Sequence, residues 1–305
     1  HDTFRRLFRL LDAKVFEACF REWISELAGV VAGVVAIDGK TACGSRDGHN
    51  TALHTVSAYA TASGLCLGQE HTRGKGHEIP AIKALLDTLA LKGCIVTIDA
   101  IGCQTEIARK ILDRGGDYLL AVKDNQKDLA DALREFFADG EIRGFGSLPV
   151  SRFQSLEKAH GRIETRQAMW VTDLSWLDKK LREHWPKLAG LGMIERQRVI
   201  NGAVSTARAY YIGSQGIKSA ESFAKAARDH WGIENSLHWV LDITFREDDC
   251  RVRKDHAPHN FAALRKFALA LLRKDTRFPK RSLRSRRKTA ERLPDYRASL
   301  LGLSS

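Results

Sequence analysis

The spacing of apolar residues predicts helices at the start of the chain and strands directly after them. Apolar side chains recur at helical spacing through residues 3–30, which predicts one or two amphipathic helices that end near Gly29. Three short apolar or alternating runs follow, separated by turn-rich segments, and each has the length and composition of a strand. They are VVAID (34–38), LHTVSAYAT (53–61) and GLCLGQEHT (64–72). This order predicts a meander of three strands.

The following segments alternate between helix and strand patterns. IPAIKALLDTLALKG (79–93) predicts a helix with Pro80 in its first turn, and CQTEIARKILDRGG (103–116) predicts a second helix. CIVTIDAIG (94–102) and DYLLAVKDN (117–125) are apolar runs of strand length. Three strands, a helix, a strand, a helix and a strand is the order used by ribonuclease H-like folds, in which the first and fourth strands lie side by side. The expected fold class is therefore α/β, with a ribonuclease H-like mixed sheet and flanking helices.

Residues 126–215 have a less regular pattern. A charged helix is expected near 126–138, and three strand-like pieces follow: RIETRQAMWV (162–171), MIERQRVI (193–200) and TARAYYIGS (206–214). We interpret this part as an inserted β-rich segment. The stretch after it, AARDHWGIENSLHWVLDITFREDD (226–249), opens as a helix.

Composition is typical of a soluble globular protein. The 305 residues are 44% hydrophobic and 28% charged, which suits one large domain or two smaller ones. No apolar run approaches the roughly 18 to 20 residues that span a bilayer, and the start HDTFRRLFRLLD lacks a signal-peptide core, so a cytoplasmic location is expected. The first residue is His rather than Met, which favours a longer reading frame cut at its N-terminus. The six cysteines are scattered without a CxxC pair, so neither a zinc site nor a disulfide framework is predicted.

The net charge of +12 is concentrated near the C-terminus. Residues 273–297 contain eleven Lys or Arg against three Asp or Glu. A basic tail of this kind suits a polyanion, with nucleic acid as the leading candidate, and the alternative is a solvated or disordered terminus.

Three carboxylates occupy positions that together suggest metal binding. Asp38 interrupts the first buried strand, Asp99 ends the strand expected beside it, and Glu234 lies on a later helix. Taken singly, the aspartates are ordinary strand-end residues and the glutamate an ordinary surface residue. Together they supply the oxygen ligands that two Mg²⁺ ions need. Nearby acidic residues are alternatives for the third ligand: Asp242, Glu247, Asp248 and Asp249.

Five stretches, found in order between about residues 3 and 273, resemble a known protein family. They are AIDGKT, GKGHEIPAIKALLDTLALKGCIVTIDAIGCQTEIARKIL, GGDYLLAVKDNQ, HGRIETR and HWGIENSLHWVLDITFREDD. The set resembles the DDE transposases of bacterial insertion sequences, specifically the ISAs-type group that includes the H-repeat-associated proteins. The resemblance implies a catalytic core in which Asp38, Asp99 and Glu234 bind two Mg²⁺ or Mn²⁺ ions. It also implies cleavage and strand transfer of double-stranded DNA at the element ends, a homodimer in the DNA complex, and a nucleoid-associated protein of a bacterial cytoplasm.

The same resemblance implies three parts and one departure from the wider superfamily. Residues 1–30 would be the remnant of an N-terminal helical region, 31–273 the catalytic domain with its insertion at about 126–215, and 274–305 a basic C-terminal tail.

The wider superfamily often shows a Tyr, Arg, Glu, Lys signature around the glutamate. Here the Arg and Lys places hold His230 and Leu241. The residues that fit the ISAs-type version, and that are expected to support the glutamate or contact phosphate, are His230, Asn235 and His238.

Basic residues near the carboxylates are candidate DNA contacts. Lys40 and Lys123 lie near strand ends, where they either offset phosphate charge or are simply solvated. Arg251, Arg253 and the basic tail are expected to contact phosphates, which carry little sequence information. Two other functions stay open at this point: a catalytically inactive DNA-binding remnant, and a two-metal DNA nuclease without strand transfer.

Overall fold

The computed structural model describes residues 2–46, 48, 51–72, 74, 76–159 and 162–303. Parts of two stretches quoted above lie outside the described residues, namely Lys75 of GKGHE and His160 and Gly161 of HGRIETR.

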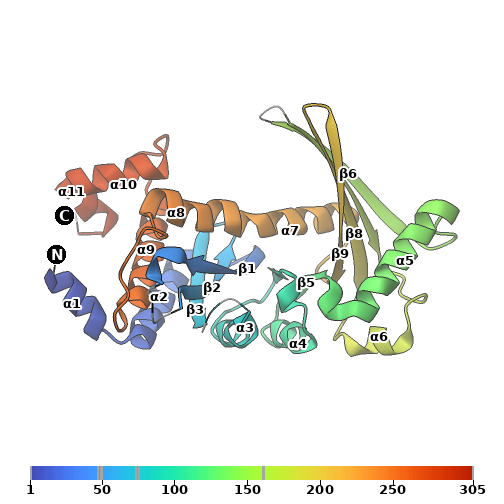
Figure 1. Cartoon of the computed structure of the whole chain (residues 1–305), viewed down its shortest axis with the longest axis horizontal. Coiled ribbons are helices and arrows are strands. Elements are labelled where there is room, and N and C mark those ends of the chain that lie inside the picture. The colour runs from blue at the N-terminus through green and yellow to red at the C-terminus, as the bar shows by residue number, and fades with distance from the viewer. Residues whose placement is uncertain are drawn as a thin grey trace. The chain divides into compact units, whose positions relative to one another are not determined.

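The described strands form one mixed sheet of nine in the order β3-β2-β1-β4-β5-β9-β8-β7-β6 (Figure 1). Their bounds are β1 Gly33–Ala42, β2 Leu53–Ala60, β3 Leu65–Thr72, β4 Cys94–Ile98, β5 Asp117–Val122, β6 Val150–Ala159, β7 Arg162–Val171, β8 Gly190–Ile200 and β9 Ala203–Gly213.

The first five strands have the order and directions of a ribonuclease H-like fold. β2 and β3 are antiparallel, whereas β1 pairs with β4 and β4 with β5 in parallel. The β1–β4 register runs from Gly33 opposite Cys94 to Ile37 opposite Ile98. Parallel neighbours need a crossover connection, and the helices α3 (Glu78–Asp87) and α4 (Thr105–Asp113) lie in the chain between these strands. The predicted fold class is therefore confirmed.

Helices account for most of the remaining described chain. Their bounds are α1 Asp2–Leu10, α2 Ala13–Ala28, α3 Glu78–Asp87, α4 Thr105–Asp113, α5 Lys127–Arg143, α6 Lys179–His184, α7 Ala220–Gly232, α8 Trp239–Phe245, α9 Ala257–Lys274, α10 Leu283–Arg292 and α11 Pro294–Leu300. A π-helical turn, Ile233–His238, joins α7 to α8. Among the described helices, none is both long and apolar enough to cross a bilayer.

The chain divides into two compact units. Unit 1 comprises His1–Val31, Asp38–Thr88 and Gly232–Ser305, and unit 2 comprises Ala32–Ile37 and Leu89–Trp231. The division falls after Ile37 within β1 and after Trp231 within α7. Each unit therefore draws on segments that are far apart in the sequence.

In unit 1, α2 and α9 pack against one another and on β3. Helix α2 begins after Asp12, whose carboxylate accepts hydrogen bonds from the N–H groups of Lys14 and Val15 and so caps the helix. The rings of Trp23 and Phe267 pack in a tilted arrangement with their centroids 4.0 Å apart. The buried cluster beside them consists of Phe20, Ile24, Leu65 and Ala270.

A buried polar cluster also joins α2, β3 and α9. The backbone N–H of Gln69 donates to Glu17 Oε1 at 3.1 Å, and the Lys266 ammonium donates to Gln69 Oε1. Burial raises the pKa of Glu17 to about 7, although the charge of Lys266 acts in the opposite direction. This cluster makes the stability of unit 1 depend on pH.

The basic tail of unit 1 is folded as the short helices α10 and α11. Tyr296 is buried, and its hydroxyl donates to Asp275 Oδ2 at 2.7 Å. Arg286 donates to the backbone carbonyl of Leu272, and Arg287 donates to that of Thr244. The described part of the tail is therefore not disordered, and some of its arginines fasten it to unit 1.

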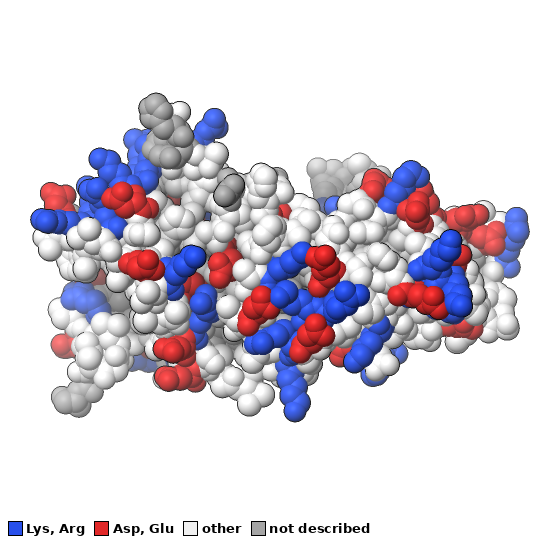
Figure 2. Space-filling model, turned by 90° about the horizontal axis from the view of Figure 1, so that it is seen from below, with Lys and Arg blue, Asp and Glu red and all other residues white. Residues whose placement is uncertain are grey.

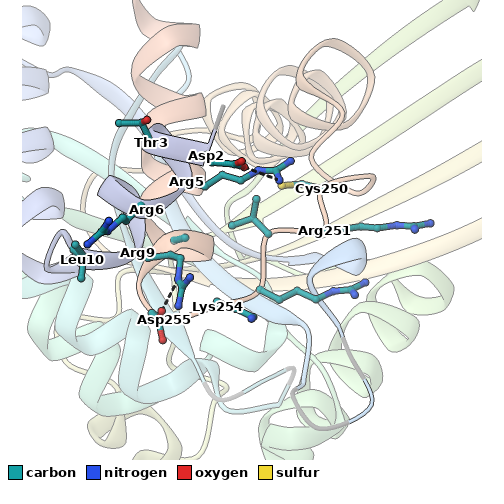
Figure 3. Close-up of a pocket in the computed structure, with 13 residues that line it drawn as sticks. Asp2, Thr3, Arg5, Arg6, Arg9, Leu10, Cys250, Arg251, Lys254 and Asp255 are labelled. Atoms are coloured by element: carbon teal, nitrogen blue, oxygen red, sulfur yellow. Dashed lines mark hydrogen bonds and ion pairs between the residues drawn. The ribbon is translucent and has the colours of Figure 1, made fainter.

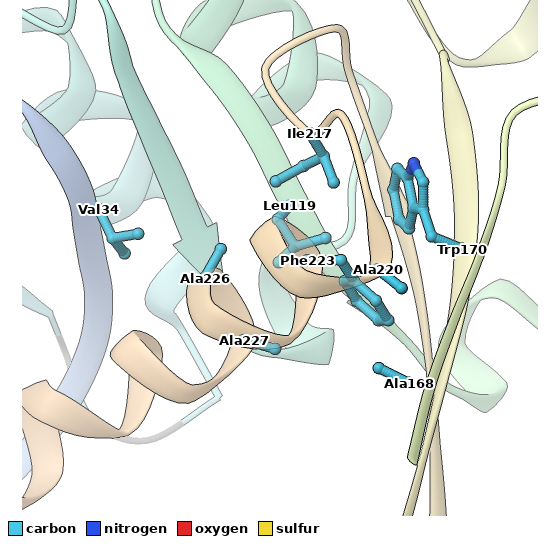
Figure 4. Close-up of a cluster of buried hydrophobic side chains, with 9 residues drawn as sticks. All are labelled: Val34, Leu119, Ala168, Trp170, Ile217, Ala220, Phe223, Ala226 and Ala227. Atoms are coloured by element: carbon cyan, nitrogen blue, oxygen red, sulfur yellow. The ribbon is translucent and has the colours of Figure 1, made fainter. Parts of the chain in front are cut away.

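In unit 2, the β-rich insertion continues the sheet through the antiparallel pairing of β9 with β5. β7 has the bounds predicted from RIETRQAMWV, and α5 extends the predicted charged helix to Arg143. β6 and α6 were not predicted. Helix α7 covers a buried cluster on this sheet (Figure 4), made of Val34, Leu119, Ala168, Trp170, Ile217, Ala220, Phe223, Ala226 and Ala227.

Gly192 of β8 permits a close contact in that cluster. A Cβ atom at this position would lie 2.6 Å from the Phe223 ring and 2.7 Å from Trp170. Any larger residue would therefore push α7 away from the sheet.

Candidate active site

Two of the three predicted carboxylates are placed by the neighbouring strands β1 and β4. Residues 34–37 of β1 are buried, as expected for an interior strand, and they end with Ile37 opposite Ile98 of β4. Asp38 continues β1 after Ile37, and Asp99 is the first residue after the end of β4. The prediction that these strands are neighbours is confirmed. Within unit 2, Asp99 Oδ1 accepts a hydrogen bond from Ile101 N–H at 3.1 Å and so caps the short 3₁₀ helix Ala100–Gly102.

The turn that Asp99 caps is held by side chains from the end of β5. Asn125 Nδ2 donates to the carbonyl of Ala100 at 2.7 Å, and Gln126 Nε2 donates to that of Cys103 at 2.9 Å. Asn125 and Gln126 belong to the stretch GGDYLLAVKDNQ, but no role was predicted for them from the sequence. Two adjacent amides directly after a buried strand were the available signal, because such groups commonly bond to a nearby loop backbone.

Glu234 lies on the π-helical turn Ile233–His238 of unit 1. Ile233 and Leu237 are fully buried and hold this turn in place, whereas the Glu234 side chain is 50% exposed. π-helical turns are rare and are frequently found at functional sites, because the inserted residue shifts the side chains around it. The sequence predicted a helix here but not its π-helical geometry.

Asp38, Glu234 and His238 come together within unit 1. His238 Nδ1 lies 3.6 Å from Asp38 Oδ2 and 3.4 Å from Glu234 Oε2, and one ligand atom from each residue lies within 4.8 Å of the other two. His238 is 5% exposed, and its Nε2 has no hydrogen-bond partner among the described residues. Two carboxylates that face the same point repel each other unless a cation or a donated proton lies between them.

This donor set fits a divalent cation. Carboxylate oxygens are the ligands that Mg²⁺ and Mn²⁺ prefer, and an imidazole nitrogen is accepted by transition metals. His238 also fits a supporting role, because with a proton on Nδ1 it directs that proton toward both carboxylates. The sequence predicted that His238 supports the glutamate or contacts phosphate, and the structure brings His238 and Glu234 together.

Lys40 contacts three carboxylates of unit 1. Its ammonium lies 2.7 Å from Asp242, 3.2 Å from Asp248 and 3.8 Å from Glu247, and we refer to these four residues as the Lys40 cluster. Burial acts to lower the pKa of Lys40, but the hydrogen bond and charge of Asp242, together with the other two carboxylates, raise it above the usual value. The Lys40 side chain is only 11% exposed. The Lys40 ammonium therefore offsets the charge of acidic side chains of the protein itself.

The Lys40 cluster accounts for three of the four acidic residues considered as alternatives for the third ligand. The fourth, Asp249, pairs with Arg246 at 2.7 Å on the surface. None of the four belongs to the group formed by Asp38, Glu234 and His238. Asp248 also accepts a hydrogen bond from Cys43 N–H at 3.1 Å, which ties the segment after α8 to the end of β1.

A buried hydrogen-bond chain supports the same end of β1. His54 Nε2 lies 2.6 Å from Glu78 Oε1, and His54 Nδ1 lies 2.7 Å from Thr41 Oγ1. Gly39, directly after Asp38, permits this arrangement, because a Cβ there would lie 2.6 Å from His54 Nε2 and 2.9 Å from Glu78 Oε1. Sequence reasoning missed His54 and Glu78. The only signal was the histidine alternating with apolar residues inside β2.

The other predicted DNA contacts are spread over both units. In unit 2, Lys123 is exposed at the end of β5, and His230 Nδ1 lies 3.0 Å from Thr97 Oγ1. In unit 1, Asn235 and Arg251 are exposed. Arg253 instead donates two hydrogen bonds, of 3.0 and 3.2 Å, to the carbonyl of Gly44.

Fold and site together define a ribonuclease H-like protein with an acidic candidate metal site. Residues 3–271 match the family model described as the Transposase DDE domain. The match covers most of the chain, and the chain belongs to this transposase family.

Proteins named as transposases, including an H-repeat-associated one, are similar in sequence to this chain over most of its length. "H repeat-associated putative transposase YhhI" of Escherichia coli strain K12 is 37% identical over 312 residues, covering 99% of this chain and 80% of the relative. "Putative transposase YncI" of Escherichia coli O157:H7 is 40% identical over 278 residues, covering 89% of this chain and 70% of the relative. The predicted resemblance to H-repeat-associated proteins is confirmed. Among solved structures, a piggyBac transposase synaptic complex with hairpin DNA matches with a TM-score of 0.44 and 9% identity, covering 90% of this chain and 53% of that one.

Proposed function

We propose that this protein cuts DNA at the ends of an insertion sequence and joins the freed 3′ ends to target DNA. The observation that carries the proposal is the meeting of Asp38 and Glu234 at His238, from segments far apart in the chain. Family membership supports the same reaction class. Double-stranded DNA is accordingly the proposed partner, both as element end and as target.

Asp38, Asp99 and Glu234 are the proposed ligands of two Mg²⁺ or Mn²⁺ ions. Such ions, when bound, lower the pKa of a water and stabilise the leaving 3′ oxygen of a phosphodiester. Asp38 and Glu234 supply carboxylate oxygens, and His238 orients them through Nδ1. Asp99 is included because its strand is the parallel neighbour of the strand before Asp38.

Lys40 has a positioning role in this proposal. Its ammonium is occupied by the Lys40 cluster, so it fastens the end of β1, and with it Asp38, to the segment after α8. Lys123, Asn235 and Arg251 are exposed and are the proposed phosphate contacts outside the metal site.

The test compares ligand variants with a matched control that lies close by in the chain. Asp38→Asn, Asp99→Asn and Glu234→Gln each keep the side-chain shape and remove one charge, as does the control Asp249→Asn at the exposed Arg246 pair. Labelled duplexes that carry the element ends are incubated with each variant and Mg²⁺, and nicked and joined products are counted. We expect each ligand variant to lose roughly 100-fold or more in cleavage, to bind DNA as before, and to keep its circular dichroism spectrum.

The products separate this function from its alternatives. Joined products from the unaltered chain are the expected result. Nicks without joined products would leave a two-metal nuclease, and binding without nicks would leave a DNA-binding remnant. Cleavage at the control rate by Glu234→Gln would remove that residue from the ligand set.

A further inference from the structure

We propose that a groove between α1 and Cys250–Asp255 binds the phosphate backbone of duplex DNA, a proposal that rests on the function proposed above. The groove has a volume of about 1300 Å³ and lies within unit 1 (Figure 3). The segment Cys250–Asp255 forms one wall and α1 forms the other. The face drawn in Figure 2 carries basic and acidic side chains mixed together, so the net charge alone does not define a DNA surface. The lining of the groove differs from this mixed surface, because basic residues outnumber acidic ones there.

Six basic residues line the groove against two acidic ones. The acidic ones are Asp2 and Asp255, and the basic ones are Arg5, Arg6, Arg9, Arg251, Arg253 and Lys254. Asp255 pairs with Arg9 at 2.7 Å, and Asp2 lies 3.8 Å from Arg5 in a pair whose side chains are largely exposed. In Figure 3, Arg5 and Arg9 reach from α1 toward the opposite wall.

Three of the six basic side chains have no acidic partner among the described residues. They are Arg6, Arg251 and Lys254, and all three are exposed. Arg253 differs, because its guanidinium is engaged by the Gly44 carbonyl and holds its wall in place. When exposed cations of this kind neutralise phosphates, the counterions condensed on the DNA are released. This release is the main source of affinity for DNA.

Both walls of the groove are anchored. The buried Asn260 of α9 donates from Nδ2 to the carbonyls of Phe8 and Leu11, at 2.8 and 2.7 Å. The rings of Phe8 and Phe261 lie 4.9 Å apart. Because α1 and Cys250–Asp255 keep a set spacing, little ordering is needed when an anionic backbone enters the groove.

One wall of the groove is tied to the end of β1, the strand that contains Asp38. The wall segment begins directly after the Lys40 cluster, and Asp248 of that cluster accepts from Cys43 N–H at the end of β1. A Cβ on Gly44 would lie 2.3 Å from the Asp248 carbonyl and 2.9 Å from that of Cys250, so the wall runs closely against the β1 end. Duplex DNA whose backbone passes this wall is the occupant that the basic lining of the groove and its link to the Asp38 strand favour.

The test neutralises the unpaired cations and measures binding. The groove variant is Arg6→Gln, Arg251→Gln and Lys254→Gln together, and a conservative version is Arg6→Lys with Arg251→Lys. The charge-matched control is Lys179→Gln, Lys180→Gln and Arg182→Gln on the exposed surface of α6 in unit 2. Affinity for a labelled duplex is measured by fluorescence anisotropy between 50 and 200 mM salt, with equal urea midpoints as the check on folding.

We expect the groove variant to flatten the plot of log affinity against log salt by about 2 to 3 units, close to 0.9 for each lost phosphate contact. The conservative version keeps the slope, because it keeps the charge, and the control keeps it within about half a unit. An unchanged slope in the groove variant would overturn the groove while leaving the proposed function intact, since cleavage is scored separately. An equal change in the control, or tighter binding to duplex RNA than to DNA, would overturn it as well. Absence of any duplex binding by the unaltered chain would instead count against both proposals.

Discussion

Replacing Lys40 by Met should strongly destabilise unit 1, because it leaves three carboxylates without their shared cation. The Lys40 pKa is raised in the folded state, so its contribution is fully present below the unfolded-state pKa of roughly 10.4 and is lost only as pH rises through the folded-state value. At pH 7 to 8 the whole contribution is therefore available to lose. Met keeps the length and apolar stem of Lys and removes only the charge.

The size of the effect follows from the exposure of the three acids. Removing one partner of a buried ion pair costs about 3 to 5 kcal/mol. Asp242 and Asp248 are 31% and 41% exposed, so water recovers part of this cost, and Glu247 keeps Arg265 at 3.6 Å. We expect a loss of about 2 to 3 kcal/mol in the free energy of unfolding at pH 8.

Urea unfolding of the Lys40→Met variant at pH 8 and at pH 5 measures this loss. Burial raises the pKa of Asp242, and the variant removes the hydrogen bond from Lys40 that acts in the opposite direction, so this carboxyl binds its proton still more tightly. The loss should consequently be smaller at pH 5 than at pH 8. The control, Lys179→Met, alters a side chain that is 75% exposed and 3.8 Å from Glu183, and should change stability by less than about 0.5 kcal/mol. A loss below about 1 kcal/mol at pH 8, or one that grows at pH 5, would refute the reasoning.

Two further substitutions test the surroundings of the site. Gly39→Ala should lower the free energy of unfolding by about 1 to 3 kcal/mol, because the new methyl group meets the buried His54 and Glu78 pair. A loss under about 0.5 kcal/mol in urea unfolding would argue against that contact. Glu17 has a pKa raised to about 7, so its contribution to stability is greatest below its unfolded-state pKa of about 4.5 and falls as pH rises through about 7, by roughly 3 kcal/mol in total. Glu17→Gln should remove this slope in urea titrations from pH 5 to 8, and parallel profiles for the two proteins would contradict the assignment.

The sequence by itself predicted the ribonuclease H-like sheet, and it named Asp38 and Glu234, which the structure brings together at His238. Runs such as 34–37 and 94–98 consist mostly of buried, largely β-branched residues, and this local pattern is sufficient to define interior strands. β7 was predicted with its observed bounds from the strand-like segment RIETRQAMWV. β6 was missed, because the apolar residues of VSRFQSLEKA recur at every third position, whereas a half-buried strand has them at every second position.

Only the tertiary structure decided which groups meet. Lys40 was expected to face phosphate or solvent, yet its ammonium is held by acids from a segment far along the chain, and His54 pairs with Glu78 across two elements. The arginines of the tail resemble one another in the sequence, but Arg286 and Arg287 donate to backbone carbonyls. The physical reason is that hydrophobic periodicity is local and survives in a short window, whereas ion pairs and buried hydrogen bonds depend on distances between segments that folding alone brings together.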